Sequence, residues 1–325
     1  MKPVEKNIAI ALLNWNGKKW LEKFLPDLLA HSRDAKIYVI DNASEDDSVV
    51  FLQKNYPQIK IISLPVNVGF AEGYNKGLIK IPEDFIVLLN TDVQVSEGWL
   101  DPLVDLLLSD EKIAAVQSKI RSYRNPEYFE YAGAAGGFLD NLGYPYCDGR
   151  IGNKVEKDTG QYDKIKEIQW ASGACMLVRK SVFFKTGGFD EKFFAHQEEI
   201  DWAWRARRHG YKIMYQPGSV VYHVGGGSLS YGDARKIYLN FRNNLLTLIK
   251  NLPPQMLFPV FFSRLILDGL AGVMFLFQGK PSHTFAVIKA HFSVYTHLLS
   301  YLKTRRKPYI KRFYKEKWTL LNSFF

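Results

Sequence analysis

The chain has 325 residues, of which 47% are hydrophobic and 23% charged, a composition that predicts a folded protein with a sizeable core and excludes global disorder. Its net charge of +10 is concentrated near the C-terminus, because residues 1–251 hold 32 basic and 31 acidic side chains. A near-neutral body argues against a nucleic-acid partner and indicates that the C-terminus meets an anionic surface.

The N-terminal part alternates apolar runs of strand length with segments of helical spacing. The predicted strands are Ile8–Leu13, Lys36–Ile40, Ile59–Leu64 and Phe85–Leu89. The predicted helices are residues 18–31, Ser44–Lys54 and Ala71–Ile79. This order predicts an α/β fold with a mostly parallel, doubly wound sheet.

Two further features bear on the compartment. The first apolar run is too short for a signal peptide and is expected to be a buried strand. The two cysteines, Cys147 and Cys175, are too few for a disulfide framework and fit a reducing cytoplasm.

A polar residue follows each of the four predicted strands. These residues are Asn14, Asp41, Asn67, and the pair Asn90 and Asp92. Turn formation alone explains any single one of them, but ligands of doubly wound sheets bind beyond the carboxyl ends of the strands. The turn after the first strand has no GxGxxG, and no P-loop is present, which excludes dinucleotide-dependent dehydrogenases and P-loop NTPases.

Short motifs of the chain resemble, in the same order, those of the family 2 inverting glycosyltransferases, particularly the bacterial rhamnosyltransferase-like branch. They are Leu13–Asn16, Asp41–Ser44, Asn67–Asn75, Leu89–Asp92, Ser172–Ala174, Gly188–Glu191, Glu198–Asp201 and His223–Gly226. The resemblance implies a GT-A fold over residues 1–250, with a nucleotide-sugar-binding half (1–118) and an acceptor and catalytic half (119–250). Residues 251–325 are expected to form a helical extension.

The resemblance implies a donor site at the strand ends. Asp41 would contact the base or ribose of the nucleotide, and the loop carrying Asn67, Gly69 and Asn75 would close over it. A carboxylate suits this position because it accepts charge-assisted hydrogen bonds. The other expected donor-binding residues are Asn14, Asn90, Asp92 and Arg242, although a surface salt bridge explains Arg242 equally well.

The resemblance also implies a divalent cation, Mg²⁺ or Mn²⁺, held by Asp92 and His223. Hard cations take oxygen ligands and leave positions for phosphate oxygens. The family's DxD appears here as Asn90-Thr91-Asp92, so the donor diphosphate is expected to supply much of the coordination. The alternative for His223 is a half-buried histidine at a strand end.

The family's catalytic base corresponds to Glu199, which the resemblance makes the candidate base, with Glu198 sharing the role or holding the acceptor. Asp201 is a candidate acceptor contact, or else the partner of Arg205 in an i,i+4 ion pair. The other acceptor-side candidates are Trp170 and Gly173.

The C-terminal quarter is apolar and then basic. Residues 256–277 approach the length of a membrane span, but Arg264 and Asp268 interrupt them, which argues against a simple crossing. With residues 288–302 they are expected to pack on the inner face of the cell membrane or to insert halfway into it, suiting a glycan or lipid-linked acceptor; a buried helical pair is the alternative.

Two other functions compete with a glycosyltransferase that uses a nucleotide-diphosphate donor such as dTDP-rhamnose. A nucleotidyltransferase of sugar phosphates would share the sheet and the metal, but residues 14–19 make a poor version of its Gly-rich, basic loop. A catalytically degenerate glycan-binding or scaffold protein is favoured only by the departures from the family pattern at Asn90 and Glu199.

Overall fold

The computed structural model describes residues 7–131, 133–152, 154–225 and 233–315. Part of the glycine loop after His223, residues 226–228, and the last residues of the basic tail, 316–325, lie outside these ranges. The strands are β1 Ile8–Asn14, β2 Lys36–Asp41, β3 Lys60–Ser63, β4 Phe85–Asn90, β5 Val93–Val95, β6 Ile113–Ser122, β7 Gly137–Leu139, β8 Pro145–Cys147, β9 Arg150–Ile151, β10 Lys154–Val155, β11 Lys166–Ile168, β12 Cys175–Arg179 and β13 Lys212–His223. The helices are α1 Lys18–Ala30, α2 Ser48–Asn55, α3 Gly69–Lys80, α4 Leu100–Ser109, α5 Lys180–Lys185, α6 Glu198–Arg208, α7 Ala234–Asn251, α8 Pro254–Phe277 and α9 Pro281–Thr304, with a 3₁₀ turn over Glu191–Phe193.

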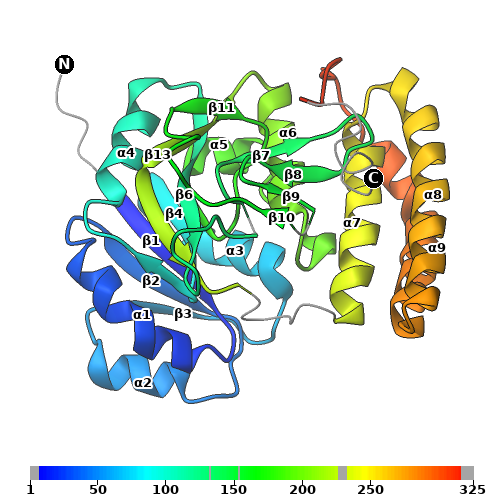
Figure 1. Ribbon diagram of the computed structural model, residues 1–325. Coiled ribbons are helices and arrows are strands. Elements are labelled where there is room, and N and C mark those ends of the chain that lie inside the picture. The colour runs from blue at the N-terminus through cyan, green and yellow to red at the C-terminus, as the bar shows by residue number, and fades with distance from the viewer. Residues whose placement is uncertain (1–6, 132, 153, 226–232, 316–325) are drawn as a thin grey trace.

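The described strands form a mixed central sheet in the order β11-β13-β6-β12-β4-β1-β2-β3, with β5 paired to β13 (Figure 1). The four N-terminal strands β1 to β4 run parallel, while β12 is antiparallel to both of its neighbours. The predicted α/β class with a mostly parallel sheet is therefore confirmed. The sheet is mixed because β5, β11 and β12 run antiparallel to their neighbours.

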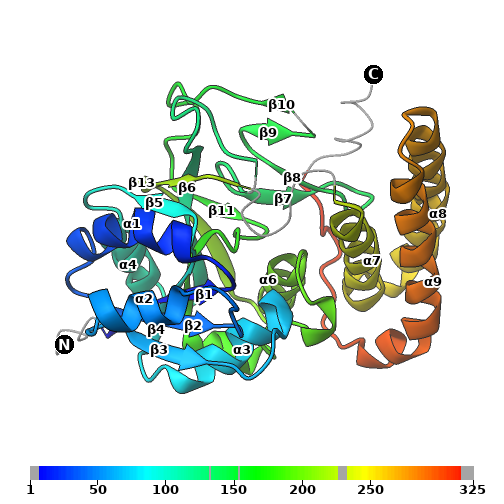
Figure 2. The same ribbon diagram turned by 90° about the horizontal axis from the view of Figure 1, so that it is seen from below.

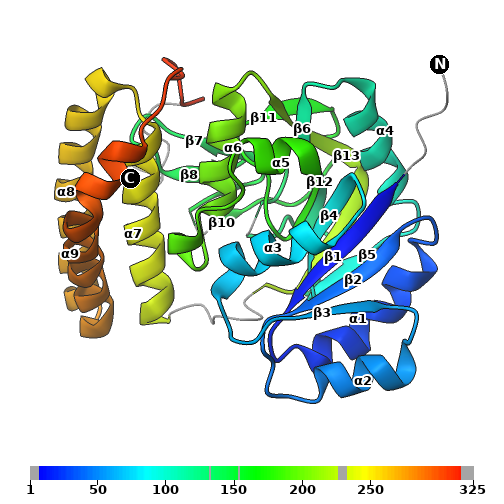
Figure 3. The ribbon, with the colours of Figure 1, turned by 180° about the vertical axis from the view of Figure 1, so that it is seen from behind.

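Helices cover both faces of the sheet, each over its own apolar core. One core packs α1, α2 and α4 against the bulky side chains Ile8, Ile10 and Leu12 of β1. The other packs α3, α5 and α6 against the opposite face, where β1 presents the small residues Ala9 and Ala11 (Figure 3). This alternation of bulky and small side chains is the period-2 pattern expected of a strand buried on both faces.

One prediction of local structure is wrong. The second helix begins at Ser48 rather than Ser44, because residues 44–46 form a loop in which Asp46 accepts a hydrogen bond from the Ser48 backbone at 3.1 Å. Residues 119–170, for which no elements are predicted from the sequence, contain a small antiparallel sheet in the order β10-β9-β8-β7. Its strands are two or three residues long, too short to show alternation.

The C-terminal residues form a helical layer at one edge of the molecule. Helix α7 lies between the sheet domain and the hairpin formed by α8 and α9, which is the outermost layer (Figure 2). The C-terminal helical extension is thus confirmed, while the domain boundaries at residues 118 and 250 stay predictions.

Candidate active site

The ends of β1 and β2 hold a fixed carboxylate. Asn14 and Asp41 are register partners, and both are buried. Asn14 Nδ2 donates to Asp41 Oδ1 and to the Ser44 hydroxyl, each at 3.0 Å, and the Ser44 N–H donates to Asp41 Oδ2 at 3.2 Å. The sheet therefore brings these two predicted donor-binding residues together and fixes the orientation of the carboxylate.

The loop before α3 is tied to the same strand end. Asn42 Nδ2 donates to Asn67 Oδ1 and to the Gly69 carbonyl, each at 3.0 Å, and its own oxygen accepts from the Val68 N–H at 3.0 Å. The predicted donor-binding residues Asn67 and Gly69 thus lie beside the end of β2, next to Asp41.

Asn75, on α3, contacts the backbone of Phe189. Its side-chain amide donates to the Phe189 carbonyl and accepts from the Phe189 N–H, each at 2.9 Å. A third bond of 3.2 Å reaches Glu191. In this structure Asn75 joins α3 to the turn that leads to α6, so its amide already has protein partners on both sides.

The predicted metal ligands Asp92 and His223 are adjacent. Strand β5 pairs with the end of β13, which brings His223 Nε2 to 3.2 Å from Asp92 Oδ1. Asn90 Nδ2 lies 3.4 Å from the same ring nitrogen. Both ligands are buried, with 5% of each residue exposed.

Glu130 is a third residue at this centre. Its Oε2 lies 3.1 Å from His223 Nδ1, on the side of the ring opposite Asp92. Burial would lower the pKa of His223, but the carboxylates of Glu130 and Asp92 raise it to about 10. Glu130 was not predicted, because its position depends on the isolated bridge between Phe129 and Arg121 of β6, which leaves no pattern in the sequence.

The donor set fits a divalent cation. Two adjacent ligands of an octahedral ion with bonds of about 2.1 Å lie about 3 Å apart, close to the 3.2 Å between His223 Nε2 and Asp92 Oδ1. A carboxylate against the other ring nitrogen is the usual orienting partner of a metal-binding histidine. Within the described ranges no group of three or more His, Cys, Asp or Glu residues has the arrangement of a complete metal site. The protein would therefore supply only part of the coordination.

The candidate base stands at the start of α6. Glu198 is buried and Glu199 half-buried. Among the described residues, Glu198 Oε2 and Glu199 Oε2 have no hydrogen-bond partner. Burial raises the pKa of Glu199 to about 7, and burial together with the Glu199 carboxylate raises that of Glu198. Because buried carboxylate oxygens ordinarily have partners, these two unpartnered oxygens make the pair a candidate functional site.

The loop before α6 has an unusual backbone. Phe194, His196 and Gln197 have positive φ angles of 65°, 71° and 74°. Non-glycine residues avoid this region, and such conformations persist only where surrounding contacts enforce them. The enforcing contacts come from two sides, from α3 and from α7.

On the α3 side, the Phe194 carbonyl accepts hydrogen bonds from the N–H groups of Phe70 (2.6 Å) and Ala71 (3.2 Å). On the α7 side, Asn243 Nδ2 donates to the carbonyls of Phe193 (2.9 Å), Ala195 (2.9 Å) and His196 (2.8 Å). The loop before the candidate base is therefore hydrogen-bonded to the first turn of α3 and to α7.

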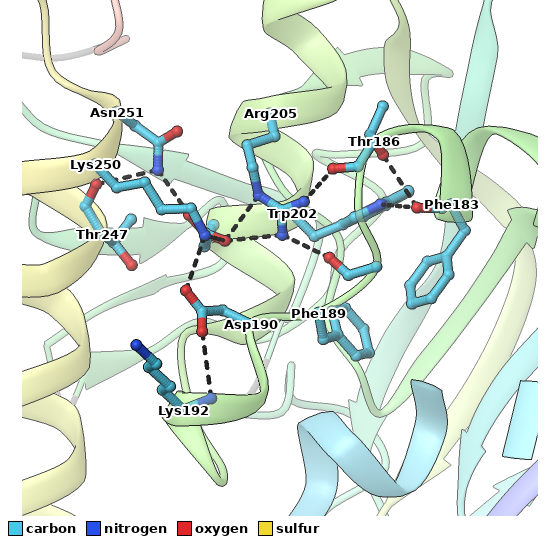
Figure 4. A network of polar contacts seen from close by, with 12 residues as sticks. Phe183, Thr186, Phe189, Asp190, Lys192, Trp202, Arg205, Thr247, Lys250 and Asn251 are labelled. Atoms are coloured by element: carbon cyan, nitrogen blue, oxygen red, sulfur yellow. Dashed lines mark hydrogen bonds and ion pairs between the residues drawn. The ribbon is translucent and has the colours of Figure 1, made fainter. Parts of the chain in front are cut away.

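Asp201 is fully buried in a polar network rather than in an open site. Figure 4 labels its partners Arg205, Lys250 and Asn251. Its carboxylate accepts from Arg205 Nη2 at 2.8 Å, from Lys250 at 2.9 Å and from Asn251 at 2.7 Å. Burial opposes ionisation, but Arg205 and Lys250 lower the pKa of Asp201 far below its usual range. The ion pair with Arg205, the alternative reading of this residue, is present; its acceptor contact stays a prediction.

The remaining predicted residues lie around the loop and the small sheet. Only 5% of Trp170 is exposed and its indole N–H donates to the Phe138 carbonyl at 3.0 Å, so little of its surface is open to an acceptor. Gly173 lies against the Phe70 ring, which a β-carbon at position 173 would approach to 3.0 Å. Arg242 donates to the carbonyls of Lys192 (2.7 Å) and Phe193 (3.0 Å), and so supports the same loop as Asn243.

The family model for glycosyl transferase family 2 matches residues 9–186, more than half of the chain. The chain belongs to glycosyl transferase family 2. Its curated relatives include the N-acetylglucosaminyl-diphospho-decaprenol L-rhamnosyltransferase of Mycobacterium tuberculosis, 28% identical over 235 residues that cover 66% of this chain and 75% of the relative. The rhamnosyltransferase WbbL of Escherichia coli is 25% identical over 227 residues, covering 66% and 83%. These relatives agree with the predicted rhamnosyltransferase-like branch.

Solved structures support the GT-A-like fold of this family 2 glycosyltransferase. GalNAc-T7 with UDP, GalNAc and Mn²⁺ superposes with a TM-score of 0.63 at 16% identity, over 78% of this chain and 49% of that chain. TarS of Staphylococcus aureus with UDP-GlcNAc gives a TM-score of 0.56 at 14% identity, over 87% and 81%. Both were solved with a nucleotide or nucleotide sugar, and the first with a divalent metal.

The first test concerns the loop of this family 2 glycosyltransferase. Asn243→Ala removes the amide that holds three loop carbonyls, so the carboxylates that follow should lose their position. We expect kcat to fall by up to about 100-fold, the cost of a misplacement of about 1 Å, with little change in donor affinity. The control is Asn55→Ala, which removes a surface amide bonded to the Phe51 carbonyl. Equal kcat values for the two variants would show that Asn243 does not position the loop.

The second test uses two glycines with positive φ. Gly69 has φ +84°, and a β-carbon there would lie 2.5 Å from the Phe194 carbonyl; Gly98 has φ +69° and nothing within 4 Å. Gly98→Ala should cost only the backbone strain, about 1–2 kcal/mol of unfolding free energy. Gly69→Ala should cost more and should also weaken donor binding. Thermal unfolding and donor titration of both variants measure the difference. Identical effects of the two substitutions would mean that the close contact between Gly69 and the Phe194 carbonyl does not matter for donor binding.

Proposed function

We propose that this protein transfers a sugar from a nucleotide-diphosphate donor to a hydroxyl of a glycan or lipid-linked acceptor, with inversion and with the help of a divalent cation. The observation that carries the proposal is the contact of His223 Nε2 with Asp92 Oδ1, at 3.2 Å, beside the strand ends that hold Asp41. A buried carboxylate and an oriented imidazole at that place suit a cation that neutralises a diphosphate.

The residues described above would bind the nucleoside, hold the cation and receive the acceptor proton. Asp41 accepts hydrogen bonds from the nucleoside, with its carboxylate already held by Asn14 and Ser44. Asp92 and His223 hold the cation, and Glu130 orients the imidazole through Nδ1. Bound Mg²⁺ or Mn²⁺ would supply electrostatic stabilisation of the leaving diphosphate.

Glu199 would act as the base that receives the proton of the acceptor hydroxyl. A base works best when its pKa lies near the operating pH, and burial raises the pKa of Glu199 to about 7. Glu198 is the neighbouring buried carboxylate and has its own unpartnered oxygen, so it would hold the acceptor or share the proton.

The donor we propose is dTDP-rhamnose. Two of the relatives are rhamnosyltransferases by name, and one of those names places its acceptor on a diphospho-decaprenol lipid. A lipid-linked acceptor would place the enzyme at the inner face of the cell membrane.

The test of this proposal is the product. The full-length protein is incubated with dTDP-rhamnose, Mn²⁺ and a lipid-linked N-acetylglucosamine acceptor, and the anomeric configuration of the new bond is determined by NMR. Inversion at the anomeric carbon is expected. Retention of configuration would exclude Glu199 as a base acting in a single displacement.

A further inference from the structure

Helix α8 has its charged residues on the buried face and its apolar residues on the exposed face. The buried residues are Val260, Arg264, Asp268 and Gly272, spaced four apart. Five exposed side chains recur at the same spacing: Phe258, Phe262, Ile266, Leu270 and Met274. Val273, Leu276 and Phe277 are also exposed near the end of the helix. Residues four apart share one face of a helix, so this is the reverse of the pattern by which a helix packs on a soluble core.

The buried charges attach α8 to the rest of the protein. Arg264 donates to the Leu142 carbonyl at 3.3 Å and to the side chain of Asn244. Asp268 accepts from the Tyr144 hydroxyl at 3.3 Å, and His291 of α9 lies 3.2 Å from it.

These contacts bear on whether α8 crosses a membrane. Among the described residues, α8 is the helix long and apolar enough to do so by length and composition. Crossing a bilayer as a separate helix would remove Arg264 and Asp268 from their partners and expose both to hydrocarbon, where ionised groups are costly. The contacts therefore keep α8 against the protein.

Helix α9 extends the apolar surface. Its exposed side chains are Phe285, Ile288, Phe292, Tyr295 and Leu299, at alternating spacings of three and four residues. The two helices lie side by side as the outermost layer, with α7 behind them (Figures 1 and 2). Many large apolar side chains are therefore exposed on two adjacent helices, and large apolar patches on soluble monomers mark interaction sites.

The segment that carries this surface is rich in basic residues. Residues 252–315 contain ten basic side chains and one acid, and of these Arg264 and the acid, Asp268, are buried. Exposed lysines stand at both ends of the α8–α9 hairpin: Lys280 in its turn, and Lys303 and Lys307 at and after the end of α9. Apolar side chains flanked by lysines match the boundary between acyl chains and anionic headgroups.

We infer that the exposed face of the α8–α9 hairpin docks in the plane of an anionic lipid leaflet, with both helices lying on the surface and neither crossing it. The docking itself does not depend on the proposed function. Its consequence does, because only a glycosyltransferase with a lipid-linked acceptor would meet that acceptor at this surface. A second copy of the chain fits the face less well, since two such faces would bring lysine-rich ends together.

Flotation of the full-length protein with liposomes tests the docking. The vesicles are phosphatidylcholine alone or mixed with phosphatidylglycerol. The wild-type protein should float with the anionic vesicles and much less with the neutral ones. The quadruple variant Phe258→Ser, Phe277→Ser, Phe292→Ser and Leu299→Ser should lose at least about tenfold in bound fraction. Its matched control, Val50→Ser with Ile79→Ser, removes equally exposed apolar side chains elsewhere and should bind normally.

A charge variant keeps the test decisive if the serine variant fails to fold. The triple variant Lys280→Gln, Lys303→Gln and Lys307→Gln should bind anionic vesicles at least about tenfold more weakly than the wild type. Added salt should weaken the binding of the wild-type protein. The control is Lys54→Gln with Lys80→Gln. Wild-type binding by both the serine and the glutamine variants would overturn the inference, as would a dimer that the serine variant dissociates and that binds no vesicles.

The orientation has its own readout. Cys147 and Cys175 are buried, so a Gln278→Cys variant carries one exposed thiol, in the turn between α8 and α9. When the protein is bound to the outside of vesicles, a membrane-impermeant maleimide should label this thiol fully. Protection that only detergent removes would mean that the hairpin crosses the bilayer.

Donor titration separates this inference from the proposed function. The docking variants should bind the nucleotide sugar as the wild-type protein does. Normal vesicle binding without donor binding would contradict the proposed function and leave the docking surface standing.

Discussion

Replacing Glu199 with glutamine is expected to lower the rate of glycosyl transfer by about 10²–10⁴-fold, the usual contribution of a positioned base, and to leave donor affinity unchanged. Glutamine keeps the size of the side chain but cannot accept the proton of the acceptor hydroxyl. Single-turnover kinetics and donor titration on the same preparation measure the two quantities separately. Glu97→Gln, an exposed carboxylate after β5, is the control for the loss of one negative charge.

The pH profile of the wild-type enzyme provides an independent check. A base must be ionised to act, and burial raises the pKa of Glu199 to about 7. The rate should therefore rise with pH through about 7 and level off above it. Because the Glu199 carboxylate also raises the pKa of its neighbour Glu198, the apparent pKa belongs to the pair. Near-normal turnover of Glu199→Gln, or a rate that falls as pH rises through this range, would exclude Glu199 as the base.

Removing the Asp92 carboxylate should have the second largest effect. Loss of an orienting partner around a metal site costs about 10–100-fold in metal affinity or activity, and loss of a direct ligand should cost at least as much. We therefore expect Asp92→Ala to raise the Mn²⁺ concentration needed for half-maximal transfer by about 100-fold or more. Because no second acid occupies position 90, His223 is the one proposed protein ligand that would remain among the described residues.

The measurement is the Mn²⁺ dependence of transfer and, independently, of donor binding. Asp34→Ala serves as control, since Asp34 is an exposed acid away from the strand ends. An Asp92→Ala enzyme with the metal dependence of the wild type would remove Asp92 from the metal site and leave His223 as an ordinary buried histidine paired with Glu130.

The sequence predicted those parts of the site that follow from strand order. Asn14 and Asp41 end neighbouring parallel strands, so a correct reading of the alternating pattern was enough to place them together. The pairing of Asp92 with His223 came from the family resemblance, since nothing local relates two residues so far apart in the chain. The structure brings these two together as the resemblance implied.

The contacts that support the site were not predictable in the same way. Asn243 reads as one polar residue of an amphipathic helix, and its role as a donor to three loop carbonyls depends on how α7 packs on the domain. Glu130 lies in a stretch without periodicity, and Asn75 is bonded to Phe189 backbone groups far along the chain. Long-range side-chain to backbone bonds of this kind leave no local pattern.

The contacts of the charged residues within α8 were also not predictable from the sequence. Arg264 and Asp268 were enough to predict that the segment does not simply cross a membrane, but not what they contact. Their partners, Asn244, Tyr144 and His291, come from three different parts of the chain.

The most direct test of the central claim is calorimetric titration of the wild-type protein with dTDP-rhamnose, UDP-hexoses, UDP-galactofuranose and GDP-mannose, each with and without Mn²⁺. Tight binding of one donor that requires Mn²⁺ is the predicted result, with dTDP-rhamnose as that donor. Binding of none of these donors under either condition would contradict the assignment of the Asp41, Asp92 and His223 region as a metal-dependent nucleotide-sugar site.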